Sequence, residues 1–141
     1  HYPLRRQRQM CIRDRRKGAM SRNHIMFGEI SAWFYKALGG IKPDPKNPGF
    51  KNILLQPNFV NDLEKFQARF EGPHGWIYSS WEKKKDKVYY EVTVPPNSTA
   101  KLCLKGKTIL KKDGIDFSKN NDDNFEALLE SGNYRFEIKV K

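Results

Sequence analysis

The sequence lacks the features that mark several common classes of protein. Although 38% of its 141 residues are hydrophobic, no apolar run approaches the roughly 20 residues that a membrane-spanning helix needs. The basic N-terminal residues are not followed by the apolar segment of a secretory signal. We therefore expect no membrane partner.

Residues that bind metals or form disulfide frameworks are also scarce. The two cysteines, Cys11 and Cys103, match no zinc spacing, and the three histidines are scattered. The acids between residues 113 and 123 do not alternate as in a calcium loop. Neither a Ser/His/Asp arrangement nor a phosphate-binding glycine loop is recognisable. The sequence thus predicts no metal and no cofactor.

Positive charge is abundant but unevenly distributed. The formal net charge is +11, of which +6 lies in residues 1–19, and the remaining basic side chains are dispersed among acidic ones. Binding to nucleic acid usually requires a basic face interleaved with aromatic or glycine residues. No such face is recognisable, so we expect no nucleic acid partner.

Residues 1–19 have neither helical nor strand periodicity and few apolar side chains. Their composition is typical of a disordered tail. The run Met10–Asp14 is also similar to the translation of a common sequencing adaptor, which indicates a non-native segment. Residues 1–19 are therefore excluded from the predicted domains.

One helix is predicted after this tail. Possible N-cap residues occupy 21–23, and Gly39–Gly40 is a strong C-terminal stop. Between them, apolar side chains recur at helical spacing and predict a packing face that needs a larger helical partner. This stripe consists of Phe27, Ile30, Phe34 and Leu38.

A β-rich region follows a connector at residues 42–50, whose three prolines exclude helix and central strand. From Lys51 onward the hydrophobic period becomes two. Turn residues separate seven or eight short strands, the last two of which flank Ser131–Asn133 as an expected hairpin. The pattern predicts a mainly β fold, an antiparallel β-sandwich preceded by one α-helix. The expected strands are 53–55, 65–70, 76–81, 88–94, 100–104, 108–110, 126–130 and 134–140.

Few side chains suggest chemistry. Asn23 and His24, at the start of the helix, form a candidate contact for a sugar or another substrate, or else an exposed cap. His74 and the loop acids are typical turn residues. A further set of aromatic residues could form a sugar-stacking platform or belong to the core. This set comprises Trp33, Trp76, Tyr78 and Trp81.

Several segments, in this order, resemble the C-terminal part of the bacterial α-L-rhamnosidases, inverting glycoside hydrolases with an (α/α)6 barrel. The first is Asn23-His24-x-x-x-Gly28, similar to an Asn-His-Tyr-x-x-Gly segment of the family, with Ile25 in place of Tyr. The resemblance extends from Met20 to Lys141. The other segments are Trp33–Lys36, Gly40–Ile41, Lys42–Pro45, Pro48–Lys51, Ala68–Arg69, Gly72–Gly75, Ser79–Trp81 and Val92–Ala100.

This resemblance implies that residues 20–41 are the last helix of a catalytic barrel, 42–50 a connector and 51–141 a C-terminal β-sandwich domain. It implies an intact parent that hydrolyses terminal α-L-rhamnose, with a general acid and a general base. Both acids would lie upstream of His24, so no catalytic residue is expected in this chain, which would be inactive alone. The implied partners are a rhamnose-containing glycoside, contacted by His24 and less directly by Asn23, and the missing barrel.

Three hypotheses for the sandwich follow. It is part of a glycosidase, or a stand-alone carbohydrate-binding module that uses Trp76, Trp81 or Tyr78, or a purely structural domain that packs on the barrel. We favour the structural role within a rhamnosidase parent.

Overall fold

The computed structural model describes residues 28–105, 108–111, 114–119 and 124–139. The chain divides into two units, residues 1–32 and 33–141, and each is described by itself. The described part of the first unit belongs to helix α2 (Gly28–Trp33). Ile30 in this helix is 51% exposed.

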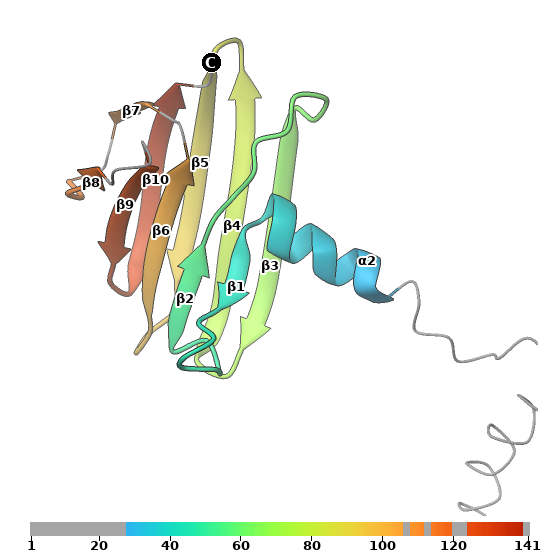
Figure 1. The fold of residues 1–141 in the computed structure, drawn as a ribbon, viewed down its shortest axis with the longest axis vertical. Helices are drawn as coiled ribbons and strands as arrows, with labels where there is room; N and C mark the ends of the chain where they lie inside the picture. The colour runs from blue at the N-terminus through green and yellow to red at the C-terminus, as the bar shows by residue number, and fades with distance from the viewer. Residues whose placement is uncertain (1–27, 106–107, 112–113, 120–123, 140–141) are drawn as a thin grey trace, which may run out of the picture. The chain divides into compact units, whose positions relative to one another are not determined.

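The second unit is a sandwich of two five-stranded sheets (Figure 1). The first sheet has the strand order β1-β2-β6-β9-β8, and the second has the order β3-β4-β5-β10-β7. A short π-helix, η2 (Phe34–Leu38), precedes the first strand. The strands are β1 (Ile41–Pro43), β2 (Asn52–Leu55), β3 (Lys65–Gly72), β4 (Gly75–Lys84), β5 (Lys87–Val94), β6 (Thr99–Lys105), β7 (Thr108–Lys111), β8 (Ser118–Lys119), β9 (Asn124–Leu129) and β10 (Gly132–Lys139).

Strict alternation of side chains explains the two layers. In β5 every second residue, from Val88 to Val94, is buried, whereas Tyr89 and Glu91 point to the other face. The period of two in the sequence thus becomes one apolar and one polar face of each strand. Pairing the two apolar faces removes them from water, which is the main driving force for folding.

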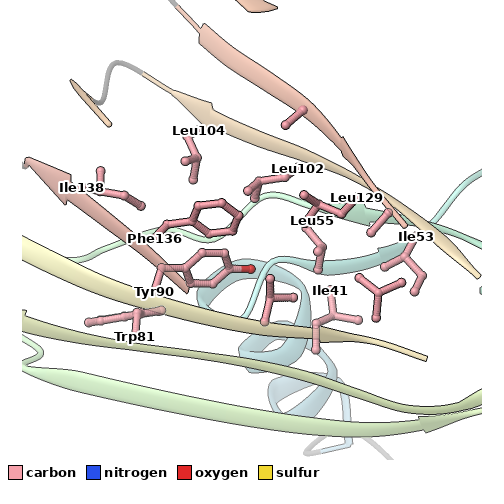
Figure 2. Packing of buried hydrophobic residues seen from close by; sticks show 14 of the residues in the cluster. Ile41, Ile53, Leu55, Trp81, Tyr90, Leu102, Leu104, Leu129, Phe136 and Ile138 are labelled. Atoms are coloured by element: carbon pink, nitrogen blue, oxygen red, sulfur yellow. The ribbon is translucent and has the colours of Figure 1, made fainter. Parts of the chain in front are cut away.

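The core contains a row of aromatic side chains between aliphatic ones (Figure 2). The rings of Tyr90 and Phe136 stack with centroids 6.2 Å apart, and Phe59 meets Trp81 edge-on at 5.6 Å. Leucines from the first sheet, such as Leu102, face these rings from the opposite layer. Each aromatic pair adds about 0.5–1.5 kcal/mol beyond its buried area.

The predicted sandwich is confirmed, and each of the eight expected strands has a counterpart. The structure adds two short edge strands, β1 and β8. β1 overlaps the start of the predicted connector, and its edge position agrees with the exclusion of Pro43 from a central strand. One pairing departs from the antiparallel expectation: β2 and β6 run parallel, with Asn52 opposite Thr99 and Leu55 opposite Leu102.

The predicted final hairpin is wrong. β9 pairs with β6 and β8 in the first sheet, whereas β10 pairs with β5 and β7 in the second. Ser131 therefore lies where the chain crosses from one layer to the other. Leu129 and Phe136, on the two sides of this crossing, are both buried in the shared core. A turn signal shows that a chain reverses, but it does not show which strand the next segment pairs with.

Two leucines of the first sheet provide a matched test of the core. Leu55 is fully buried, whereas Leu128 is 65% exposed. We expect Leu55→Ala to lower the free energy of unfolding by about 2–5 kcal/mol, because it leaves a cavity between the layers. Leu128→Ala should change it by about 0.5 kcal/mol or less. Urea denaturation measures both, and equal losses would contradict the buried position of Leu55.

Candidate functional site

The predicted sugar-contacting residues, Asn23 and His24, lie outside the described residues, as does Phe27 of the predicted packing face. The structure does describe how the end of the helical segment that follows them joins the sandwich. Leu38 is buried, whereas Phe34, on the same predicted stripe, is 43% exposed. In the predicted packing face, Leu38 is thus covered, whereas Ile30 and Phe34 are exposed.

The helical segment changes its winding before it ends. Over Phe34–Leu38 it is a π-helix, and the Gly39 N–H donates to the Phe34 carbonyl oxygen at 3.1 Å. Single π-turns often occur at functional sites. The chain then turns sharply at Gly40, which has φ +69°, a conformation that glycine adopts without steric cost.

The sandwich caps this helix end through four consecutive carbonyl groups. The Ala37 oxygen accepts a hydrogen bond from Asn58 Nδ2 at 2.9 Å, and the Leu38 oxygen accepts one from Trp81 Nε1 at 3.1 Å. The next two accept hydrogen bonds from Ser79 Oγ at 2.7 Å (Gly39) and from the Gln56 backbone N–H at 2.9 Å (Gly40). The carbonyls at a helix C-terminus lack partners within the helix, so these donors satisfy groups that would otherwise be orphaned.

Two of these donors come from the inward face of β4. Ser79 and Trp81 are almost fully buried, and the Ser79 hydroxyl also lies 3.3 Å from the Tyr90 hydroxyl. Burial raises the pKa of Tyr90 above its ordinary value, and the hydrogen bond from Ser79 opposes this shift only in part. The arrangement therefore favours a neutral, hydrogen-bonded cluster beneath the helix end.

Exposed aromatic rings lie along the π-helix. Trp33 is 56% exposed, and its ring meets that of Phe34 edge-on, with centroids 5.5 Å apart. Tyr35 is in edge contact with Phe70 of β3 at 6.3 Å, and Phe50 packs on Phe70 at 4.6 Å. Exposed aromatic rings close together, such as Trp33, Phe34 and Tyr35, are typical of an interaction site.

The four aromatic residues considered as a sugar platform do not come together. Trp81 is 1% exposed and caps the helix, so it cannot stack on a ligand. Trp76 and Tyr78 share the outward face of β4. The guanidinium carbon of Arg69 lies 3.8 Å from the centroid of a Trp76 ring, which covers part of that indole. The platform interpretation is therefore wrong for Trp81 and stays open for Tyr78.

Two shallow grooves meet on this outward face. Their volumes are about 540 and 360 Å³, and Tyr78 and Glu91 line both of them. The larger groove also contains Gln67, Ser80 and Tyr89. Sequence analysis singled out Tyr78 but missed the neighbouring polar side chains, which belong to three different strands.

His74 and Asp44 fit the interpretation as turn residues, whereas Asp113, Asp122 and Asp123 lie outside the described residues. His74 lies exposed in the turn between β3 and β4. The Asp44 carboxylate accepts hydrogen bonds from the Lys46 backbone N–H at 3.0 Å and from Asn47 Nδ2 at 3.2 Å. Both hydrogen bonds stabilise the charged carboxylate and so lower the pKa of Asp44. The bond from the Lys46 N–H has the larger effect.

Within the part of the chain that the structure describes, no group of three or more His, Cys, Asp or Glu side chains could hold a metal ion. In the same residues, no helix is long and apolar enough to cross a membrane.

The fold and the capped helix end define the chain as an all-β domain that receives a helical segment at its N-terminal side. A family model, the bacterial α-L-rhamnosidase C-terminal domain, matches residues 40–114. The chain belongs to this family. The expected resemblance is thereby confirmed, including the assignment to the C-terminal part of such proteins.

Relatives support the same assignment. The chain is 33% identical over 129 residues to an α-L-rhamnosidase of Formosa agariphila, covering 84% of this chain and 14% of the relative. It is 36% identical over 86 residues to an α-L-rhamnosidase of an Alteromonas species, covering 61% of this chain and 9% of the relative. The chain thus spans a small fraction of the length of the curated relatives it matches.

Solved structures agree with the fold. The α-L-rhamnosidase from Dictyoglumus thermophilum superposes with a TM-score of 0.70 at 27% identity, over 87% of this chain and 15% of that one. The Streptomyces avermitilis α-L-rhamnosidase, solved in complex with L-rhamnose, gives a TM-score of 0.69 at 23% identity, over 84% of this chain and 12% of that one.

Two glycines test the close approach at the helix end. A Cβ at Gly40 would lie 2.2 Å from the backbone carbon of Gln56, whereas a Cβ at Gly49 would meet nothing within 4 Å. Both have positive φ, so alanine strains the backbone at each. We expect Gly40→Ala to destabilise the protein by about 2 kcal/mol or more beyond Gly49→Ala, measured by urea denaturation. Equal losses would refute the close packing.

The raised pKa of Tyr90 predicts that the protein loses stability at alkaline pH. Because its folded pKa is raised, its contribution is fully present below the unfolded pKa of about 10 and is lost as the pH rises towards the folded pKa. Between pH 10 and 11.5, the free energy of unfolding should fall more steeply in the wild type than in Tyr90→Phe, by up to about 1.4 kcal/mol per pH unit. Lys87 and Lys101, whose pKa values are also raised, are present in both proteins. Parallel slopes would contradict this prediction.

Proposed function

We propose that this chain is the C-terminal part of an α-L-rhamnosidase, and that its sandwich fixes the end of the last helix of a catalytic domain upstream. The observation that carries this proposal is that donors from the sandwich and the segment after β2 bind four consecutive carbonyls, Ala37 to Gly40, at and just after the helix end. Family membership and the names of the relatives support the glycosidase activity of the parent.

The proposed reaction removes terminal, non-reducing α-L-rhamnose by a single displacement with inversion. A carboxylic acid protonates the leaving oxygen, and a carboxylate roughly 6.5–9.5 Å away activates the attacking water. Both groups belong to the upstream barrel, so the 141-residue chain alone releases no rhamnose. His24 contacts the bound sugar beside the general base, with a weaker contribution from Asn23. Ile25 stands where relatives of the family usually have tyrosine, so the hydroxyl of that tyrosine is absent near the site.

The sandwich acts by holding the barrel rather than by chemistry. The described end of the helix has its carbonyl groups fixed by the core of the second unit, so the chain leaves the barrel at a defined point. The aromatic patch formed by Trp33, Phe34, Tyr35 and Phe70 is the surface on which the upstream domain docks. Desolvating about four rings is enough to stabilise such an interface by several kcal/mol.

Substitution of His24 in the intact parent tests the proposal. His24→Ala should lower kcat/KM for an aryl α-L-rhamnoside by about tenfold to hundredfold, because a hydrogen bond to the sugar is lost. His74→Ala is the matched control, since this exposed turn histidine should leave the kinetics unchanged. The assay follows release of the coloured aryl alcohol.

Two outcomes would reject this proposal. A wild-type parent that releases no rhamnose from the aryl rhamnoside would remove the activity, and measurable turnover by the 141-residue chain would remove the upstream location of the acids. If His24→Ala and His74→Ala behave alike in an active parent, the assigned role of His24 is wrong.

A further inference from the structure

The outer face of the second sheet carries ordered rows of side chains across its strands. The register places Arg69, Tyr78, Thr93 and Asn133 in one row across β3, β4, β5 and β10. The next row comprises Gln67, Ser80, Glu91 and Arg135. Each row thus combines groups that donate and accept hydrogen bonds, and the first also contains a half-buried aromatic ring.

The two grooves on this face follow these rows. Tyr78 and Glu91 line both grooves, so together they form the point where the grooves meet. The larger groove, about 540 Å³, has a size typical of small-ligand sites. The smaller one continues it across β5 towards Asn133 on β10.

We propose that this face is an accessory glycan-binding site, in which Tyr78 stacks on a sugar ring and Glu91 accepts hydrogen bonds from sugar hydroxyls. The ligand class is a segment of a rhamnose-containing polysaccharide lying across the strands. The choice of rhamnose rests on the proposed function, since the side chains of the site indicate only a flat, hydroxyl-rich ligand.

The chemistry of the side chains matches such a ligand. Sugar rings have apolar faces that pack on aromatic rings and hydroxyl edges that need hydrogen-bond partners. Glu91 is held in place by Arg135, whose Nε lies 3.0 Å from a Glu91 carboxylate oxygen. The Thr93 hydroxyl donates to Asn133 Oδ1 at 2.7 Å and orients that amide. The polar groups are therefore positioned before a ligand arrives, which reduces the entropy lost on binding.

A protein partner fits this face less well than a glycan does. Around the grooves the aromatic residues alternate with ion pairs, Lys84 with Glu82 at 3.2 Å and Lys87 with Glu137 at 2.7 Å. Charged residues are depleted at the cores of protein interfaces, because burying them is costly. Among the described residues, no ion pair involves the patch around Trp33 and Phe34, which is why we assign protein docking to that patch and glycan binding to this face.

Tyr78, rather than Trp76, provides the stacking surface. Arg69 already covers part of the Trp76 indole at 3.8 Å, and Trp76 lines neither groove. Tyr89, at the far end of the larger groove, lies 5.7 Å from Lys84 Nζ. Tyr78 lies between these two positions, beside Ser80 and Glu91.

Affinity electrophoresis of the 141-residue chain tests the site. The gels contain rhamnogalacturonan, with dextran as a polysaccharide free of rhamnose. We expect rhamnogalacturonan to retard the wild type, and Tyr78→Ala to weaken the apparent affinity about tenfold. Glu91→Gln, which preserves shape, should also weaken it. Leu128→Ala, exposed on the other sheet, is the control expected to bind like the wild type. Circular dichroism checks that each variant is folded; if Tyr78→Ala is not, Glu91→Gln decides the outcome.

Each result has a defined meaning. No retardation of the wild type, equal retardation by dextran, or full binding by the folded variants would overturn the site. Retardation of the chain but not of the parent would show that another domain covers this face, and would overturn it as well. The parent is assayed separately on an aryl rhamnoside: hydrolysis without glycan binding refutes only this inference, whereas absence of hydrolysis refutes the proposed function.

Discussion

The structure depends on one constraint, the need to satisfy the carbonyl groups of a helix that ends against a buried surface. An unsatisfied buried polar group costs about 1–3 kcal/mol, and the adjacent carbonyls of the buried residues Leu38, Gly39 and Gly40 present that cost together. The sandwich meets it with donors from distant parts of the chain, Asn58, Trp81, Ser79 and the Gln56 N–H. Glycine at residue 40 follows from this, since the chain there approaches the backbone of Gln56 too closely for a Cβ atom.

Much of the sandwich could be predicted from local pattern. Val88 to Val94 alternate without exception, and the turn at Gly72–Gly75 brings β3 and β4 together in register. Pairing between distant strands could not be predicted, because periodicity shows which face of a strand is buried but not which strand lies beside it. The parallel pairing of β2 with β6 and the crossing at Ser131 are of this kind.

The site was less accessible to sequence reasoning. Asn23 and His24 were selected from their position at the helix start and then from the resemblance, and they stay predictions. For Trp81 the pattern left a sugar-stacking platform and the core open, and Trp81 faces the core with Ile77 and Ser79. A signal was present: a serine between apolar residues on the inward face of a strand must find a buried partner, so Ser79 indicated a buried acceptor. The sequence could not show that this acceptor is the Gly39 carbonyl.

The two faces of β4 connect the anchor to the outer groove. Inward, Ser79 and Trp81 hold the helix end, and each is fixed by a hydrogen bond in the core. Outward, Tyr78 and Ser80 alternate with them along the same backbone. Because β4 pairs on both sides, with β3 and β5, its outward side chains stand on one of the most constrained backbones of the domain. Sites built on such rigid elements hold their geometry better than sites on loops, so the strand that secures the helix also presents the groove.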